Sequence, residues 1–224
     1  MMTELRCAGT GSSGNAYALM AGDEILLLDA GRPVREVERM TDFRMNDISG
    51  GIISHAHADH AKYVPDLKRM GIGIWCPYET GETSITLGKF QIKAFELPHD
   101  GVENRGFVIR FDGHVMLYLT DFEYCKYSFK KLRPEYILVE CNYQKELVEG
   151  TDIANLAHKV LGHAELQTTV SFVSANKTDA LKNVILCHMG RGSDPETMIK
   201  TVRKAAGKGV KVDIAGAQKG IKLR

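Results

Sequence analysis

Short apolar runs that end in a polar residue or a turn recur along this chain and predict a fold rich in β-strands. Residues 83–87 and 89–97 alternate polar and apolar positions, as the two strands of a hairpin do. Other strands are expected at 5–7, 16–20, 25–31, 51–53, 72–76, 105–111, 115–119, 136–140, 183–187 and 210–214. Helices are expected at 33–43, 61–70, 152–161, 164–175 and from Asp194, and a lysine-rich tail ends the chain. The first half should therefore be mostly strands and the second a mixture of strands and helices.

A run of potential metal ligands follows the apolar residues 51–53. The sequence there is Ser54-His55-Ala56-His57-Ala58-Asp59-His60, with three imidazoles and one carboxylate within six positions. Zinc, iron and manganese take such ligands from proteins. A loop that leaves a buried strand can hold them in a fixed geometry. The spacing favours a metal site over a surface loop that is merely rich in histidine.

Further polar residues lie where other apolar runs end, and strand ends at one edge of a sheet can converge. They are His99, Asp121, Glu140 and His188. Pro98 lacks a backbone donor and is expected to end strand pairing, which would place His99 on a loop. His114, beside a turn glycine, and His158, within a helix, do not fit this pattern and are expected to be structural.

Two features leave alternatives open. Asp29, which ends the strand at 25–31, can orient a ligand imidazole or serve as a turn or helix-cap carboxylate. Residues 9–15, Gly-Thr-Gly-Ser-Ser-Gly-Asn, can approach a phosphate or make a tight hairpin connection. They are not a Walker loop, because the Gly-Lys-Ser/Thr ending is missing and a strand follows.

Composition narrows the class of protein. The chain of 224 residues has 44% hydrophobic and 25% charged residues, as an ordinary globular protein does, and its net charge of +1 creates no general attraction for nucleic acid. The odd number of cysteines and the lack of a Cys-x-x-Cys pair argue against a disulfide framework, and Cys7, Cys141 and Cys187 should be core residues. With neither a signal-like start nor a membrane-length apolar run, the expected location is a reducing cytoplasm.

The ligand pattern, taken with the polar strand ends, resembles the metal-ligand set of the metallo-β-lactamase superfamily over residues 5–215. This resemblance implies an α+β fold, a four-layer αββα sandwich, and a single hydrolase domain over residues 1–224. It also implies two divalent metal ions, zinc first, with manganese or iron as alternatives. The first metal would be held by His55, His57 and His99, the second by Asp59, His60 and His188, and Asp121 would bridge them. Two such metals, roughly 3.5–4 Å apart, can share a hydroxide that attacks a substrate.

Sequence around the ligands favours the phosphodiesterase branch of the superfamily. Leu-Pro-His-Asp at His99 differs from the Pro-Gly-His-Thr of β-lactamases and glyoxalase-like thioesterases. Val139-Glu140-Cys141-Asn142 and Gly162-His163-Ala164-Glu165 resemble motifs of tRNase Z-type and YycJ/WalJ-type proteins. There the Glu and His pair, and the His serves the scissile phosphate and the leaving oxygen. The resemblance thus implies catalytic roles for Asp59, Glu140 and His163, although His163 can instead replace His188 as a ligand.

The first fifteen residues are similar to the opening of YycJ/WalJ-type proteins, which are described as DNA exonucleases. By this resemblance Ser12, Ser13 and Asn15 would contact substrate. The chain departs from the pattern after its last histidine, where Met189-Gly190-Arg191 replaces the usual Ser, and Arg191 can bind a phosphate or remain solvated. No β-CASP domain fits in the short interval between Asp121 and His163, and no tRNA-clamping arm is recognisable, so transfer-RNA and messenger-RNA cleavage are disfavoured.

The sequence therefore predicts a metal-dependent phosphodiesterase or nuclease, specifically a DNA exonuclease. Its partner would be DNA or another phosphodiester, with neither a membrane nor an obligatory protein partner. The chain also contains a basic run that comprises Lys126, Lys130, Lys131 and Arg133. This run is either a contact patch for the DNA backbone or a solvated helix face. One alternative is a phosphodiesterase for small cyclic phosphates or nucleotides. Less favoured are a thioesterase or lactonase, in which Glu140 and His163 would not touch, and a flavodiiron-type redox module.

Overall fold

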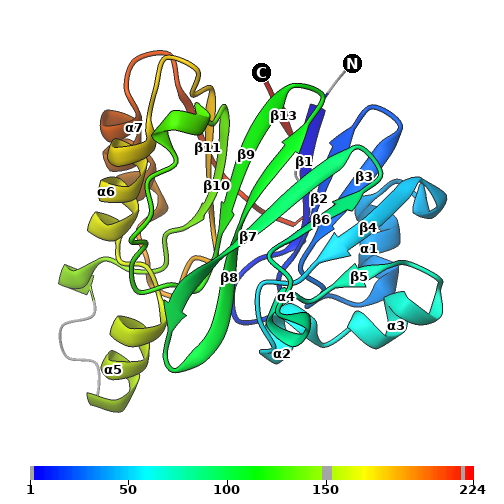
Figure 1. Ribbon diagram of the computed structural model, residues 1–224. Helices are drawn as coiled ribbons and strands as arrows, with labels where there is room; N and C mark the ends of the chain where they lie inside the picture. Colours follow the sequence, from blue (N-terminus) through cyan, green and yellow to red (C-terminus); the bar gives the residue numbers. More distant parts are fainter. Residues whose placement is uncertain (1–2, 148–152, 218–219) are drawn as a thin grey trace.

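Two β-sheets pack face to face, with helices on their outer faces (Figure 1). The computed structural model describes residues 3–147, 153–217 and 220–224. The first sheet comprises, in order, β13 (Gly220–Leu223), β1 (Thr3–Gly9), β2 (Ala16–Ala21), β3 (Glu24–Leu28), β4 (Ile48–Ile52) and β5 (Ile74–Trp75). The second comprises β12 (Lys211–Ile214), β11 (Asn183–Cys187), β10 (Tyr136–Glu140), β9 (His114–Leu119), β8 (Val102–Phe111), β7 (Phe90–His99) and β6 (Ser84–Leu87).

Helices cover both outer faces and complete four layers, which confirms the predicted αββα sandwich. On the first sheet these are α1 (Val34–Met40), α2 (Ala58–Ala61), α3 (Val64–Arg69) and α4 (Pro77–Thr80). On the other side of the molecule lie α5 (Ile153–Gly162), α6 (Leu166–Asn176) and α7 (Pro195–Ala206). Short 3₁₀ turns occur at Met45–Asp47, Lys130–Leu132 and Lys145–Leu147.

Three apolar clusters fill the three interfaces between these layers. Along β2, Tyr17 and Leu19 belong to the cluster between the sheets, whereas Ala18 and Met20 belong to the cluster beneath α1 and α3. Residues of β9 alternate in the same way between the central cluster and the cluster beneath α6 and α7. A strand has a side-chain period of two, so a strand buried on both faces is apolar at nearly every position. This explains the continuous apolar runs of the sequence.

Pairing of β7 continues through Pro98 to His99, so the prediction of a loop at His99 is wrong. Pro98 lies opposite Glu103 and His99 opposite Val102 in β8. The carbonyl of Pro98 accepts a hydrogen bond from the backbone N–H of Glu123 (3.0 Å), and therefore points away from β8. Since the N–H and C=O of one residue point to the same side of an antiparallel strand, a proline here removes no bond to β8.

Two other expectations also need correction. The end of the lysine-rich tail forms β13, in which Ile221 and Leu223 are buried against the central core and Lys222 points outward. The helix expected at 61–70 is divided into α2 and α3, because the backbone N–H of Tyr63 bonds the carbonyl of Ala30 (2.9 Å) instead of continuing a helix. For the helix expected at 152–161, position 152 lies outside the described residues, and α5 covers the rest.

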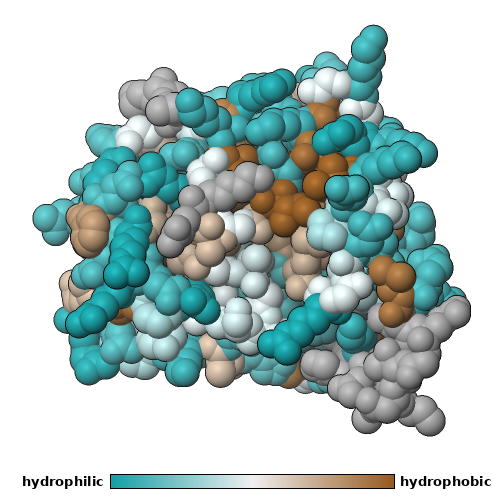
Figure 2. Space-filling model, turned by 180° about the vertical axis from the view of Figure 1, so that it is seen from behind, coloured by the Kyte–Doolittle hydropathy of each residue, from teal (hydrophilic) through white to brown (hydrophobic). Residues whose placement is uncertain are grey.

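Several composition-based expectations agree with the structure. All five cysteines are unpaired, and Cys7, Cys141 and Cys187 are buried in apolar clusters as predicted. Residues 9–15 connect the antiparallel strands β1 and β2, so the loop makes a hairpin connection. None of the described helices has the length and hydrophobicity needed to cross a bilayer. Figure 2 shows a largely hydrophilic rear face whose most apolar atoms gather in its upper part.

Candidate active site

Potential metal ligands from both sheets converge at the edge of the molecule that is lowermost in Figure 1, where α2 and the β7–β8 turn lie. β9, β10 and β11 are parallel neighbours, so residues at or just after their carboxyl ends, Asp121, Glu140 and His188, reach the same edge. We call the following residues the donor cluster: His55, His57, Asp59, His60, His99, Asp121 and His188.

The first half of the donor cluster consists of three histidines whose ring nitrogens lie within 4.8 Å of one another: His55, His57 and His99. His57 Nδ1 and His99 Nε2 are 3.1 Å apart. His99 Nδ1 donates to the carbonyl of Gly162 (2.6 Å), which directs Nε2 into the cluster. Burial and the imidazole of His60 lower the pKa of His55 to about 2, so His55 is neutral, the form that binds a metal.

Asp59, His60, Asp121 and His188 form the second half, again with ligand atoms within 4.8 Å. Asp121 Oδ2 lies 2.5 Å from His60 Nε2, and Asp121 Oδ1 lies 2.9 Å from His188 Nδ1. Burial acts to raise the pKa of Asp121, but His188 and His60 outweigh it and hold that pKa well below its usual value. Asp121 therefore lies at the centre of the cluster as a carboxylate.

Unsatisfied atoms show that these residues fit cations. Among the described residues, His55 Nε2 and both carboxylate oxygens of Asp121 are buried without a hydrogen bond of good geometry. Leaving buried polar atoms unsatisfied costs about 1–3 kcal/mol each. Mixed nitrogen and oxygen donors of this kind suit zinc, manganese or iron. The donor set thus fits two divalent cations that share Asp121.

Asp29 supports the donor cluster from beneath. His60 Nδ1 donates to Asp29 Oδ2 (2.7 Å), and the backbone N–H of Ser54 donates to Asp29 Oδ1 (2.8 Å). Of the two roles left open for Asp29, the structure supports orientation of an imidazole. Asp29, Asp121 and His188 have φ of 59°, 50° and 48°, a left-handed conformation that is costly for residues other than glycine. Such strain clusters at functional sites.

Glu140 and His163 are in contact, as the sequence predicts for the phosphodiesterase branch. His163 Nδ1 lies 2.8 Å from Glu140 Oε1. Burial acts to lower the pKa of His163, but Glu140 and Asp121 outweigh it and raise that pKa to about 9. The imidazole is 11% exposed, whereas the buried ring of His188 is 1% exposed. Of these two histidines, His163 is the one more accessible to a substrate.

Sequence reasoning missed that Glu140 serves two histidines. His188 Nδ1 also lies 2.9 Å from Glu140 Oε1, and Asn142 Nδ2 donates to the same oxygen (3.2 Å). Backbone N–H groups of Phe122 and Ala164 donate to Glu140 Oε2. Glu140 therefore links the His163 side of the site to the donor cluster. The only sequence signal for Asn142 is its place two residues beyond Glu140.

Comparisons with known proteins agree with this geometry. No protein-family model matches the chain. The exodeoxyribonuclease YycJ of Bacillus anthracis is 21% identical over 211 residues, which cover 80% of each chain. The exodeoxyribonuclease WalJ of Streptococcus pneumoniae is 23% identical over 215 residues, which cover 81% of this chain and 80% of WalJ.

Solved structures share the whole architecture. The metallo-β-lactamase fold protein YhfI from Bacillus subtilis has a TM-score of 0.77 at 17% identity and covers 99% of this chain and 100% of its own. This chain has the metallo-β-lactamase fold. The short form of human tRNase Z (TM-score 0.66, 15% identity, 99% of each chain) and a diphosphatase of the PhnP family (0.67, 15%, 100% and 98%) share this fold.

Of the predicted substrate contacts, the structure corrects one. Asn15 is fully buried, and its side-chain amide lies against His60 Nε2 (2.9 Å) and the carbonyl of Asp59 (3.3 Å). It therefore holds the stretch from His55 to His60, here called the ligand stretch, instead of facing substrate. Ser12 and Ser13 are exposed, and both line a recess beside Asp59. Arg191 is exposed in the loop that follows His188.

The predicted basic run does not border the donor cluster as a unit. Arg133 pairs with Asp179 (2.9 Å), which precedes β11, whereas His188 follows that strand. Lys126 pairs with Glu96 (3.6 Å). Of the two histidines expected to be structural, His114 contacts Glu135 (3.0 Å), away from the site; the side chain of His158 lies outside what the structure describes. The run is a set of surface ion pairs and solvated lysines.

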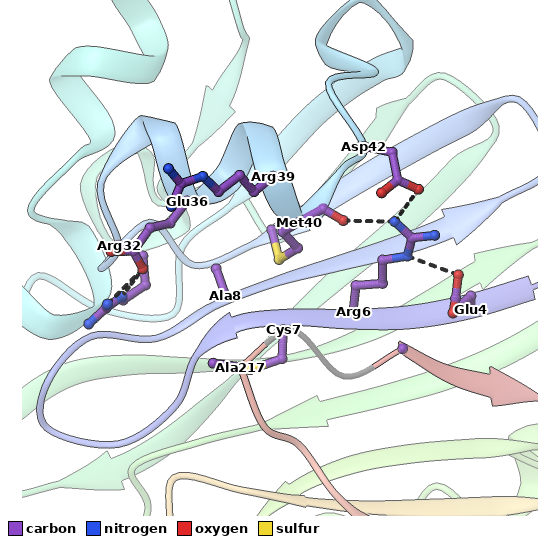
Figure 3. A pocket seen from close by; sticks show the side chains of 11 residues that line it. Glu4, Arg6, Cys7, Ala8, Arg32, Glu36, Arg39, Met40, Asp42 and Ala217 are labelled. Carbon is purple, nitrogen blue, oxygen red and sulfur yellow. Dashed lines mark hydrogen bonds and ion pairs between the residues drawn. The ribbon is translucent and has the colours of Figure 1, made fainter.

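A larger recess elsewhere contains no member of the donor cluster. It has a volume of about 660 Å³ and lies between α1 and β1 (Figure 3). Arg6 there pairs with Glu4 and Asp42, and Arg32 pairs with Glu36 (2.6 Å). These two arginines already have carboxylate partners, in contrast to the unsatisfied atoms of the donor cluster.

Gly31 is expected to be intolerant of any side chain. A Cβ at this position would lie 1.7 Å from the carbonyl oxygen of Asp59 and 2.7 Å from the backbone nitrogen of Asn15. Gly31→Ala should therefore displace the ligand stretch and weaken metal binding by roughly 10–100-fold, as loss of ligand support does. Calorimetric titration with metal measures the change in affinity, and thermal unfolding measures any change in stability.

Gly73→Ala is the matched control, because a Cβ there meets no atom within 4 Å. It should bind metal as the wild type does. Equal metal affinity in the two variants would show that the contact between Gly31 and Asp59 does not position the ligands.

Proposed function

We propose that this protein is a metal-dependent phosphodiesterase that degrades DNA from an end. Its fold neighbours and curated relatives support a metal-dependent hydrolase, and two of those relatives are named exodeoxyribonucleases. The contact between His163 and Glu140 (2.8 Å), beside the donor cluster, carries the proposal. In this contact His163 is a general acid that can protonate the oxygen leaving a phosphate ester.

The proposed metal ligands are the donor cluster itself. His55, His57 and His99 would hold one cation and Asp59, His60 and His188 the other, with Asp121 shared between them. When bound, two divalent cations supply Lewis acidity and lower the pKa of water. Zinc, manganese and iron all suit these donors.

The protein's own groups handle the proton and the phosphate charge. Because Nδ1 of His163 faces Glu140, the proton for the departing oxygen would come from Nε2. Glu140 fixes the ring and stabilises its charged form, since a carboxylate neighbour favours an imidazolium. A fixed imidazolium can also bond a phosphate oxygen as negative charge develops there. Ser12 and Ser13 are proposed to contact the substrate backbone from the rim of the site.

Two alternatives make different predictions. A thioesterase or lactonase was expected to lack the contact between Glu140 and His163, and the observed contact disfavours it. A small-molecule phosphodiesterase uses the same chemistry, and the likeness to a PhnP-family diphosphatase favours it as the second candidate.

A substrate panel tests the proposal. Protein stripped with a chelator and reloaded with zinc, manganese or iron would be assayed on bis-p-nitrophenyl phosphate, a thioester, RNA, and linear and circular DNA. We expect metal-dependent hydrolysis of the phosphate ester and of end-labelled linear DNA, with circular single strands and the thioester resistant. Thioester hydrolysis without phosphodiester cleavage would refute the proposal, and cleavage of small diesters alone would favour the second candidate.

A further inference from the structure

The recesses on the two sides of the donor cluster differ in their charged side chains, with two basic residues on one side and three acidic residues on the other. A recess of about 250 Å³, here called the cationic recess, is lined by Asp59 of the donor cluster together with Ser12, Ser13, Arg32, Lys62 and Tyr63. Beside His99 lies a recess of about 400 Å³, here called the acidic recess, lined by Asp100, Glu103, Glu123 and Leu161. The first is built from loops of the first sheet and the second from the β7–β8 turn and its neighbours, so a substrate that crosses the donor cluster meets both.

The cationic recess has the groups that a nucleic-acid strand needs. Lys62 is exposed and makes no ion pair within the described part of the chain, while its ammonium lies 5.4 Å from the ring centroid of Tyr63. The hydroxyls of Ser12 and Ser13 are exposed at the same recess. Lysine and serine side chains commonly bond phosphate oxygens, and an aromatic ring can stack on a base of any sequence.

Arg32 makes the cationic recess a built feature of the fold. Its guanidinium donates to the carbonyl of Ser13 (2.9 Å) and pairs with Glu36 (2.6 Å). It therefore ties the loop that carries Ser12 and Ser13 to α1. The volume of 250 Å³ is below the roughly 300–1,000 Å³ of pockets that enclose a whole small ligand. The recess thus suits one phosphate or one base of a longer strand.

The acidic recess opposes a continuing strand. Glu103 is 69% exposed and Arg105 is its ion-pair partner (3.3 Å), while Glu123 adds a further carboxylate. A strand that passed through here would bring each following phosphate against these carboxylates. A terminal nucleotide has no further internucleotide phosphate beyond the scissile one. The charge difference therefore favours an end of DNA on this side.

We propose that single-stranded DNA lies across the donor cluster in one direction, with the continuing strand on the cationic recess and the terminal nucleotide in the acidic recess. Lys62 binds a phosphate next to the scissile one, and Tyr63 stacks on a base of the continuing strand. This proposal rests on the phosphodiesterase function proposed above and adds the reason why the enzyme would act from ends.

Lys62→Ala tests the cationic side. The KM for a linear single-stranded oligonucleotide should rise about three- to tenfold, and the slope of log KM against log salt should fall by about 0.7, the value for one lost phosphate contact. The fold-decrease in activity on bis-p-nitrophenyl phosphate should be at least three times smaller than the fold-decrease in activity on the oligonucleotide. Lys68→Ala, which removes an exposed lysine of α3 outside the recess, is the control and should match the wild type.

An unchanged KM and salt slope for Lys62→Ala, or an equal change for Lys68→Ala, would overturn the cationic side of the proposal. Tyr63→Leu gives an independent measurement on the same side. It should raise the KM for DNA roughly fivefold or more through loss of stacking, while leaving the salt slope close to that of the wild type.

The acidic side is tested with circular single-stranded DNA. The double variant Glu103→Gln with Glu123→Gln should cut circles at least about fivefold faster than the wild type, because a continuing strand can then pass. Glu79→Gln with Glu82→Gln, two exposed carboxylates outside both recesses, is the matched control. Circle cutting that stays at the wild-type rate would overturn this side. A wild-type protein that cuts no phosphodiester at all would refute the proposed phosphodiesterase function. If the wild type cuts DNA and the variants cut it in the same way as the wild type, only the proposed placement of the strand is refuted.

Discussion

Asp121→Ala is expected to abolish metal-dependent phosphodiester hydrolysis. Asp121 is the donor shared by both halves of the cluster, and its buried oxygens lie within 3.0 Å of ring nitrogens from His60, His163 and His188. Losing even an outer partner of a ligand costs roughly 10–100-fold in metal affinity, so loss of a shared ligand should exceed about 100-fold. Metal content by atomic emission and turnover of bis-p-nitrophenyl phosphate measure the two effects.

Asp121→Asn separates this effect from folding, because the amide keeps the shape of the side chain without its charge. Both variants should lose metal, while their circular dichroism stays that of a folded protein. Asp179→Ala, which removes an exposed surface ion pair with Arg133, is the control and should keep metal and activity. Full activity in Asp121→Ala would contradict a site of two metals bridged by this residue.

His163→Ala is expected to retain both metals and lose turnover. The ring of His163 lies against Glu140 and is more exposed than that of His188, as suits an acid that meets substrate. General acid catalysis contributes about 10²–10⁴-fold, and kcat should fall by that factor. A substrate with a good leaving group, such as p-nitrophenolate, needs less protonation. The loss should therefore be smaller for bis-p-nitrophenyl phosphate than for DNA.

His114→Ala is the matched control for this variant, since His114 contacts Glu135 away from the site. It should match the wild type in both metal content and kcat. If His163→Ala instead loses one metal, and that lost metal accounts for the lost activity, then His163 is a metal ligand. His188→Ala gives the complementary result: it should lose metal, because His188 Nε2 lies 3.4 Å from Asp59 Oδ2 within the second half of the cluster.

Local patterns were sufficient for the strand-rich organisation of the chain and for the convergence of the donors. The stretch from His55 to His60 brings four donors together within six positions, so its chemistry depends little on distant packing. The apolar runs that end in Asp121, Glu140 and His188 also indicated convergence, because neighbouring parallel strands end at one edge. Resemblance to a superfamily then supplied the four-layer arrangement, which the structure confirms.

Contacts between residues far apart in the sequence decided the points that local patterns left open or predicted wrongly. Asn15 looked like a substrate residue in its loop, but the loop folds beneath His60 and buries it. The break in pairing expected at Pro98 fails because its carbonyl faces Glu123, a contact that no local rule contains.

By itself, then, the sequence determined a strand-rich chain and the set of residues that gather at one edge, since both follow from side-chain periodicity and strand ends, whereas the sandwich followed from the resemblance. Only the tertiary structure decided that Glu140 joins His163 to His188 and that Asp29 supports His60. It also decided that the two recesses beside the cluster differ in charge. These features depend on where side chains from separate loops meet, and the pairing of strands within each sheet brings those loops together.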